Sequence, residues 1–355
     1  MSGFTVRFPG LYTTVQDLGR FGRQSLGVPP SGALDVDALE TANLLVGNVR
    51  NEACLECVLK GPELEFVGSG AIAVCGADME VRINGNVVPR YETLAVRPGD
   101  IVSLGTANAG IRTYIAFSGG LDIAPVLGSR STYARAGFGG FQGRPLRSGD
   151  SINLREAGRE PPKLFLPEQN RPAYASDIVV RAVLSHETDR FTPDSVLRFF
   201  AESYRVSPKS DRMGCRLEGP PLAHVHGADI LSAGVQTGTV QIPGDGLPIV
   251  LLAERQTTGG YTRIAHVIRA DLPKLGQARP GDAVRFVRCS VEDAQAAWRK
   301  REAEIGATIL PSPDPGAPAV CRANPDFKWR TARWFRVTVN GRAYDVEVLP
   351  DNDVL

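Results

Sequence analysis

The chain has 355 residues, 43% of them hydrophobic and 22% charged, a composition typical of a globular protein that buries a sizeable core. This length predicts two or three domains of about 100–200 residues each. The 40 basic and 39 acidic side chains leave a net charge of +1, so no electrostatic attraction favours a nucleic acid or an anionic membrane as partner.

The body of the chain is predicted to be mainly β with a few helices. Glycine (38) and proline (26) are plentiful, and short apolar runs such as "AIAVCGA" and "PIVLLA" lie between them, which is typical of strands. The first expected helix covers about residues 34–46, where apolar residues recur on one face and Gly47 provides a stop.

One phrase occurs three times, as "RPGDIVSL" at 97–104, "RSGDSINL" at 147–154 and "RPGDAVRF" at 279–286. Each copy combines a basic residue, a turn that ends in Gly-Asp and an alternating strand, the pattern of a corner in a β-barrel or sandwich. The recurrence indicates related β-modules rather than a βαβ series, although the phrase is too short to establish a duplication.

Two further helices have start signals in the second half of the chain. Thr192, Pro193 and Asp194 provide an N-cap, a proline at the first helical position and an acid in the first turn. Ser290 and Asp293 form a capping-box pattern, from which a helix is expected to run toward Gly306.

Two stretches have the composition of boundaries. Residues 156–174 are charged and contain proline, and residues 307–326 contain five prolines, which favour an extended spacer. The predicted layout is an N-terminal β-module (1–160), a C-terminal β-module (175–305), a Pro-rich linker (307–334) and a tail hairpin (335–355). In this tail, "FRVTVNGRAYDVEV" at 335–348 reads as two alternating strands around the turn Asn340-Gly341.

Several motifs are absent from the sequence, and this narrows the chemistry. No Gly-Lys pair exists, so there is no P-loop, and no serine has the glycine neighbours of a nucleophile elbow. Cys54 and Cys57 form a lone C-x-x-C without a second pair, and the four histidines have no acidic ligand close in sequence. We therefore predict no metal.

The sequence also predicts a location. The first ten residues lack the basic-then-apolar run of a secretory signal, and no apolar run approaches the ~20 residues that span a bilayer. Six scattered cysteines fit reduced thiols. We expect a cytoplasmic protein with no membrane contact.

Four segments concentrate hydrogen-bonding side chains beside glycines: "TTVQDLGR" (13–20), "GVPPSGALD" (27–35), "SDRMGCRLEG" (210–219) and "ERQTTGGYTR" (254–263), the last preceded by "VQIPGDGLP". Such side chains can bind a carboxylate or polarise a carbonyl. They can equally belong to hairpin loops that satisfy their own backbone. The spacing alone does not separate these two interpretations.

The same segments resemble a known family. "PGLYTTVQDLGRFG", "GVPPSGALDVDALETANLLVGN", "FSGGLDIAPVLGSRSTY", "SDRMGCRLEGP" and "GTVQIPGDGLPIVLLAERQTTGGYTRIAHVI" are similar, in order, to the family of allophanate hydrolase subunit 2, also called KipA or the C subunit of 5-oxoprolinase, within the biotin-dependent carboxyltransferase group. The resemblance implies tandem cyclophilin-like β-barrel modules, without implying prolyl isomerase activity.

The resemblance also implies partners and cofactors. Family members act beside a KipI-type protein, similar to the B subunit of 5-oxoprolinase, and in some complexes beside the A subunit or a biotin carboxylase and its carrier. ATP would be used through the complex, since this chain has no P-loop, and carboxybiotin would sit on a separate carrier.

The matching motifs supply the candidate site residues. Activating an amide requires donors at its carbonyl and an acceptor at its N–H. We expect Asp17 to be a base or orienting group, Arg212 to bind a carboxylate or carbonyl, and Gln256 and Thr258 to take part in catalysis. The expected substrate-binding residues are Thr14, Gln16, Ser31, Asp35, Gln241, Thr257 and Tyr261.

The tail resembles the first strands of a biotin carrier domain, but Lys328, the last lysine, precedes the hairpin, so biotin cannot be attached within it. The tail is then a carrier remnant, a segment that completes a sheet on another chain, or a hairpin folded back on its own barrel.

The sequence leaves three functions open. The first is a subunit of a heteromeric, ATP-linked amide- or lactam-processing enzyme, either the C subunit of 5-oxoprolinase or a biotin-dependent carboxyltransferase subunit. The second is a regulatory KipA-type protein that antagonises a KipI-type kinase inhibitor. The third is a plain scaffold, for which the polar segments are denser than needed.

Overall fold

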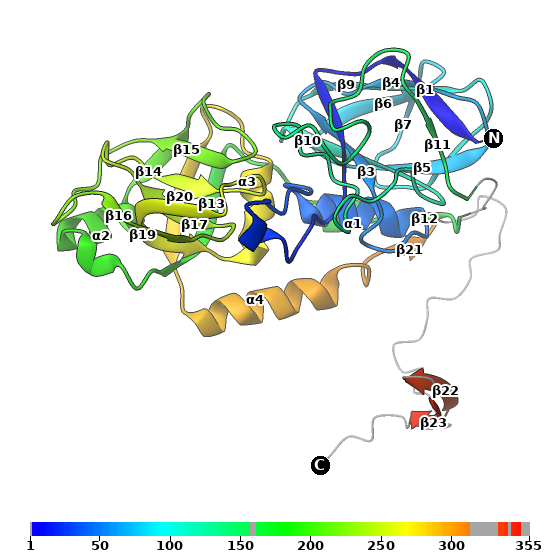
Figure 1. Cartoon of the computed structure of the whole chain (residues 1–355). Coiled ribbons are helices and arrows are strands. Elements are labelled where there is room, and N and C mark those ends of the chain that lie inside the picture. Colours follow the sequence, from blue (N-terminus) through cyan, green and yellow to red (C-terminus); the bar gives the residue numbers. More distant parts are fainter. Residues whose placement is uncertain (1, 157–160, 313–332, 340–341, 349–355) are drawn as a thin grey trace. The chain divides into compact units, whose positions relative to one another are not determined.

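The computed structural model describes residues 2–156, 161–312, 333–339 and 342–348, the last two ranges as backbone only. The chain divides into two compact units, Met1–Ser312 and Pro313–Leu355. The larger unit contains two β cores, coloured blue to teal and green to yellow in Figure 1. The prediction of a mainly β chain with a few helices is confirmed.

The N-terminal core consists of two antiparallel sheets. The first sheet has the order β11-β1-β4-β9-β6-β7 and the second β2-β3-β10-β5-β8. Phe4, Phe66 and Phe117 fill the space between the sheets, with the rings of Phe4 and Phe117 stacked at 4.8 Å. The strands are β1 (Gly3–Phe8), β2 (Tyr12–Gln16), β3 (Cys54–Val58), β4 (Glu63–Phe66), β5 (Gly70–Gly76), β6 (Met79–Ile83), β7 (Asn86–Val88), β8 (Leu94–Val96), β9 (Ile101–Ala107), β10 (Arg112–Phe117) and β11 (Ser151–Asn153).

The C-terminal core is a closed barrel. Its strands follow the order β13-β20-β14-β15-β18-β17-β19-β16, and an additional β13–β19 pairing closes the ring and leaves β16 outside it. All pairs are antiparallel except β13 with β20. Closure removes the exposed edges that an open sheet would present. The strands are β13 (Asp177–Leu184), β14 (Ser203–Val206), β15 (Gly214–Glu218), β16 (Asp229–Gly234), β17 (Thr239–Ile242), β18 (Ile249–Leu251), β19 (Thr258–Val267) and β20 (Ala283–Arg288).

The three predicted helices are confirmed. They are α1 (Val36–Leu45), α2 (Pro193–Ala201) and α4 (Val291–Glu304). Thr192 caps α2 and Ser290 forms the capping box of α4 with Asp293, as the local signals predicted. A fourth helix in the described residues, α3 (Leu272–Gly276), was not predicted because five residues carry no periodicity. Four short 3-10 turns complete the helical elements, η1 (Gln24–Leu26), η2 (Glu168–Asn170), η3 (Thr188–Arg190) and η4 (Arg269–Asp271).

The repeated Arg-x-Gly-Asp phrase forms the same turn three times. Asp100, Asp150 and Asp282 each accept a hydrogen bond from the backbone N–H of the arginine three residues earlier, at 2.7, 2.7 and 2.8 Å. The preceding glycine has a φ of 86° to 92° in all three copies, a region that disfavours a side chain. Each turn leads directly into a strand, β9, β11 or β20.

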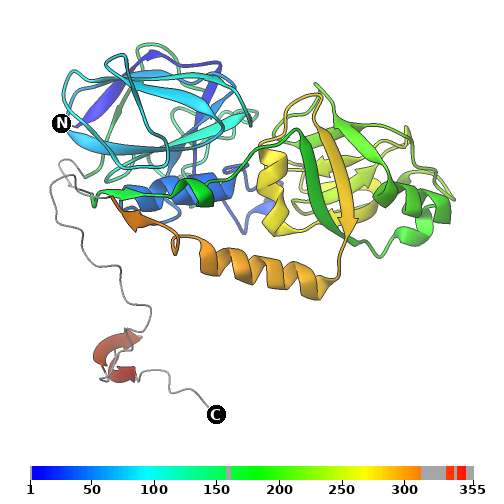
Figure 2. The same ribbon diagram turned by 180° about the vertical axis from the view of Figure 1, so that it is seen from behind.

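The two cores are joined by α3, α4 and a buried glutamine. Gln277 donates to Asp35 Oδ2 at 2.7 Å and accepts from the backbone of Ile111 and Arg112. Figure 2 shows α4 running beside both cores, and its Arg301 pairs with Asp37 and Glu40 of α1. Two short strands also pair antiparallel. They are β12 (Leu164–Phe165), which follows β11 in the chain, and β21 (Leu310–Pro311), which follows α4.

The smaller unit contains β22 (Arg333–Val339) paired antiparallel with β23 (Arg342–Val348). The predicted turn at Asn340-Gly341 and residues 313–332 of the Pro-rich stretch lie outside the described residues. Within the described part of the chain, none of the helices has the length and apolar character required to cross a membrane.

Candidate functional site

A buried ion cluster lies where the two cores meet. The guanidinium of Arg212, on the loop before β15, pairs with Glu254 at 2.5 Å through Nε and with Glu56 of β3 through Nη1, and its Nη2 donates to the Gly32 carbonyl. Burial disfavours the charge of Arg212, but the two carboxylates outweigh burial and raise its pKa. Every nitrogen of Arg212 therefore has a protein partner already.

Asp17, which follows β2, is enclosed in a similar way. Its carboxylate accepts hydrogen bonds from the hydroxyls of Ser129 and Ser131 and from the backbone N–H groups of Gly19 and Arg130, at 2.5 to 2.8 Å. Three of these bonds hold the loop at 129–131 against the end of β2, and the bond from Gly19 is local to the turn that follows. They favour the orienting role expected for Asp17 over the role of a base.

Asp35 is the N-cap of α1 and accepts from the Ala38 backbone at 3.0 Å. Its second oxygen accepts from Gln277 at 2.7 Å and from the Tyr174 hydroxyl at 3.1 Å. Burial raises the pKa of Asp35 to about 6, assisted by the nearby charge of Asp37, although the hydrogen bonds oppose this rise.

The remaining predicted residues form two separate groups. Gln16 donates to Thr14 at 3.0 Å inside the N-terminal core, and its buried Oε1 has no hydrogen-bond partner among the described residues. In the C-terminal core, Gln256 donates to Gln241 Oε1 at 3.1 Å. Three further predicted residues lie on the same loop and on β19: Thr257, Thr258 and the half-exposed Tyr261.

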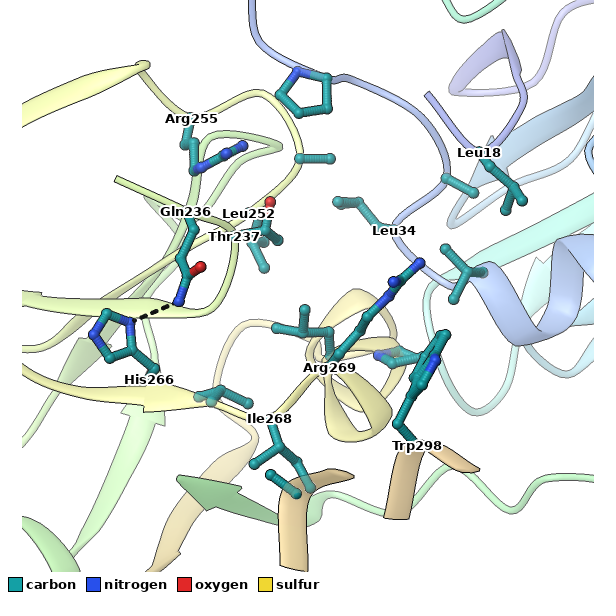
Figure 3. A pocket seen from close by; sticks show the side chains of 18 of the residues that line it. Leu18, Leu34, Gln236, Thr237, Leu252, Arg255, His266, Ile268, Arg269 and Trp298 are labelled. Atoms are coloured by element: carbon teal, nitrogen blue, oxygen red, sulfur yellow. Dashed lines mark hydrogen bonds between the residues drawn. The ribbon is translucent and has the colours of Figure 1, made fainter. Parts of the chain in front are cut away.

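A cavity of about 830 Å³ lies between the two cores, within the size range of small-molecule sites. Its walls come from the segment after β2, from the loop before β17 and the loop after β18, and from α3 and α4 (Figure 3). Ser31 lines this cavity, and it is the one residue of the predicted set that does so. Apolar side chains form much of the wall, including Leu18, Leu34, Leu252 and Ile268.

Arg255 is the main feature of the cavity that the sequence reasoning missed. Its side chain is 3% exposed, and no described residue accepts a hydrogen bond from its buried Nε or Nη1. Burial lowers the pKa of Arg255 to about 10, and no ion pair of Arg255 with a carboxylate is found among the described residues to oppose this shift. Figure 3 shows the guanidinium reaching toward the wall that carries Leu18 and Leu34.

Ser31 faces this cavity from a strained backbone. Its φ of 54° is unusual for a residue other than glycine. The conformation is held because the Ser31 N–H donates to the Ala253 carbonyl at 3.0 Å, and the flanking Pro30 carbonyl accepts from Arg20 at 2.7 Å. The Ser31 hydroxyl is buried and has no hydrogen-bond partner among the described residues.

The other polar groups of the cavity give it a positive balance. Among the described residues, Glu40 is the one carboxylate in its lining, and Glu40 pairs with Arg301. Arg269 stacks over the Trp298 ring at 4.0 Å and Arg299 lies nearby on α4. Burial, together with Arg263 and His186, lowers the pKa of His266, whose Nδ1 contacts Gln236 and Thr239.

The described residues contain no group of three or more side chains placed to hold a metal ion. Cys54 and Cys57 are fully buried in β3, and burial raises the pKa of Cys57 to about 12. A thiol that stays protonated is a poor metal ligand and a poor nucleophile.

The cavity residues carried a weak signal in the sequence. Three consecutive residues have three different environments. Glu254 binds Arg212, Arg255 lines the cavity, and Gln256 binds Gln241. The segment "ERQTTGGYTR" was singled out, but the direction of each side chain in it depends on tertiary contacts that spacing does not reveal.

Three comparisons with known proteins agree. The C subunit of 5-oxoprolinase from Escherichia coli strain K12 is 40% identical over 296 residues, which cover 82% of this chain and 93% of that protein. The urea amidolyase of Lachancea kluyveri is 32% identical over 85% of this chain, but the match spans 18% of that protein. The crystal structure of the K. lactis urea amidolyase matches with a TM-score of 0.82 at 31% identity, covering 86% of this chain and 20% of the other.

These relatives confirm the resemblance inferred from the sequence. The model of the family described as "Carboxyltransferase domain, subdomain A and B" matches residues 26–288, more than half of the chain, a range that runs from before α1 to the end of β20. The chain therefore belongs to the family of carboxyltransferase domains, subdomains A and B.

Proposed function

We propose that this chain is the C-type component of an ATP-linked enzyme that opens 5-oxoproline, the cyclic amide of glutamate. The observation that carries this proposal is the 40% identity to the corresponding 5-oxoprolinase component of E. coli, which extends over 93% of that protein. The chain spans only about a fifth of the urea amidolyases that it matches, so the activity of those larger proteins rests on parts not matched here.

The reaction consumes 5-oxoproline, ATP and two water molecules and yields glutamate, ADP and phosphate. The lactam C–N bond breaks, the carbonyl carbon gains an oxygen, and the nitrogen leaves as an amine. Amide resonance makes the carbonyl a poor electrophile, so donors at its oxygen and an acceptor at the N–H are needed. The free energy of ATP cleavage drives the step.

The loop that follows β18 is the proposed source of groups that orient the amide. The Gln241–Gln256 pair presents both a carboxamide oxygen and a carboxamide nitrogen, and Thr258 adds a hydroxyl at the start of β19. Asp17 acts in this proposal by holding the loop at 129–131 in place. Arg212 acts by fixing Glu254 and thereby the backbone that carries Arg255 and Gln256.

ATP and the partner proteins belong to the same proposal. The chain has no Gly-Lys pair, so phosphate binding is assigned to partners that resemble the A and B components of 5-oxoprolinase. The B-type partner, also known as KipI-type, is expected to complete the site.

A second candidate is a carboxyltransferase that receives a carboxyl group from biotin on a separate carrier. It is favoured by the TM-score of 0.82 to a urea amidolyase over 86% of this chain. The β22–β23 hairpin, which resembles the start of a carrier domain in sequence, would then help to dock that carrier.

The test is turnover by the full chain purified together with its B-type and A-type partners. ATP-dependent formation of glutamate from 5-oxoproline is the expected result. Carboxylation of urea-like amides after addition of a biotinylated carrier would favour the second candidate, and binding of the KipI-type partner without any turnover would favour a regulator. Gln256→Ala and Thr258→Ala should lower kcat, and full activity in both variants would remove these residues from the site.

A further inference from the structure

We propose that the cavity between the two β cores binds a small carboxylic acid, with Arg255 and Ser31 holding its carboxylate. The inference rests on the proposed function only for the choice of 5-oxoproline as the first ligand. It favours an anionic substrate over neutral urea for this site.

Arg255 is a buried cation that has no acceptor for its Nε and Nη1 among the described residues. A guanidinium removed from water is costly unless a carboxylate or another acceptor compensates it. Arg212 follows this rule with two buried carboxylates, and Arg301 follows it with the buried carboxylate of Glu40. Arg255 does not, because its Nε and Nη1 are buried and have no acceptor among the described residues.

A second unpartnered group lies in the same cavity. The Ser31 hydroxyl is buried and has no hydrogen bond to any described residue, and the Ser31 N–H is tied to the carbonyl of Ala253, two residues before Arg255. This bond brings the serine and the arginine to neighbouring parts of the lining. Both groups donate hydrogen bonds, and a carboxylate is an acceptor that two donors can share.

Arg20 provides a contrast in the same protein. It is also buried, and its Nε and Nη1 lack acceptors among the described residues. However, its Nη2 donates to the Ser131 carbonyl and its guanidinium lies 5.0 Å from the Phe138 ring centre. Arg20 does not line the cavity, so we assign it a structural role and assign ligand binding to Arg255.

The lining of the cavity indicates what kind of molecule carries the bound carboxylate. Leu18, Leu34 and Leu252 provide apolar surface, and the single lining carboxylate, Glu40, is occupied by Arg301. A small acid with a compact, weakly polar body suits this lining, and 5-oxoproline has both features. Bicarbonate, a source of a transferred carboxyl group, carries the same charge but has no apolar part to contact these walls.

The experiment measures ligand binding by the full chain with calorimetry and thermal unfolding. L-5-oxoproline is compared with 2-pyrrolidone, the same lactam without a carboxylate, and with bicarbonate. We expect 5-oxoproline to bind and raise the unfolding midpoint and 2-pyrrolidone to do neither. Binding of bicarbonate alone would keep the carboxylate site and assign it to the carboxyl donor. Equal binding of the neutral lactam, or no binding of any carboxylate, would overturn the proposal.

The variants Arg255→Met and Arg269→Met form a matched pair. Both remove one positive charge from the cavity lining, but Arg269 is exposed and stacked on Trp298. Arg255→Met should weaken carboxylate binding on the order of 10- to 100-fold, the value of hydrogen bonds to a charged group. Arg269→Met should change it by less than about threefold, and Ser31→Ala should weaken it by about two- to tenfold.

The unliganded variants provide a second measurement. Removing a buried charge that lacks a partner should raise the unfolding midpoint of Arg255→Met above that of the wild type. A lower midpoint together with unchanged carboxylate binding would refute the proposal.

Kinetic measurements on the enzyme complex distinguish a failure of this inference from a failure of the proposed function. Turnover of 5-oxoproline with an unchanged KM in Arg255→Met would refute the inference and leave the function intact. Carboxylate binding that depends on Arg255, without turnover by the complex, would refute the function and leave the inference intact.

Discussion

Replacing Arg212 by methionine should destabilise the protein more than removing any exposed arginine. Arg212 neutralises Glu56 and Glu254, whose side chains are 1% and 7% exposed. Removing one partner of a buried ion pair costs about 3–5 kcal/mol, because the other charge stays buried without compensation. Two carboxylates depend on Arg212, so we expect a loss at or above the upper end of this range.

The assay is urea denaturation of the full chain at pH 7, with the midpoint and slope measured separately. Arg285→Met is the matched control, since Arg285 pairs with Asp177 and both side chains are at least half exposed. An exposed pair contributes about 0–1 kcal/mol. The reasoning is refuted if the two variants lose the same free energy of unfolding.

Two further predictions concern α1 and α4. Burial and Asp37 raise the pKa of Asp35 from 3.8 to about 6. The folded state therefore binds this proton more tightly than the unfolded state does. As the pH rises between these two values, the wild type should lose on the order of 3 kcal/mol of unfolding free energy relative to Asp35→Asn. Asparagine can still cap α1, and urea unfolding at pH 4 and pH 7 that showed no such change would contradict the shift. Ser290→Ala removes the capping box of α4 and should lower the free energy of unfolding by about 1 kcal/mol, measured by urea denaturation. Ser232→Ala, at an exposed serine of β16, is its control, and an equal loss in both would contradict the capping role.

The parts of the fold that depend on neighbouring residues could be predicted from the sequence. The caps at Thr192 and Ser290 and the three Arg-x-Gly-Asp turns are set by side chains within three residues of one another. In contrast, closure of the barrel depends on β13 pairing with both β19 and β20, strands that begin about 80 and 105 residues later. No local pattern records such a pairing.

The candidate site was predicted only in part, for the same reason. Of the residues that the motifs predicted, Ser31 lines the cavity. The motifs did not separate Arg212, whose acceptors Glu56 and Glu254 are 156 and 42 residues away, from Arg255, which has none among the described residues. The difference between a paired and an unpaired arginine exists only after the two cores have come together.

The shared boundary between the cores has a consequence for how this protein folds. Leu34, from the N-terminal half of the chain, belongs to the apolar cluster of the barrel, and Glu56 and Arg212 lie on opposite sides of the boundary. The N-terminal half produced alone would expose Leu34, and the C-terminal half would expose the apolar residues that Leu34 contacts. Each half would also leave Glu56 or Arg212 without its partner. We therefore expect the two halves to unfold in one cooperative transition and to be recoverable in soluble form only when both are synthesised together.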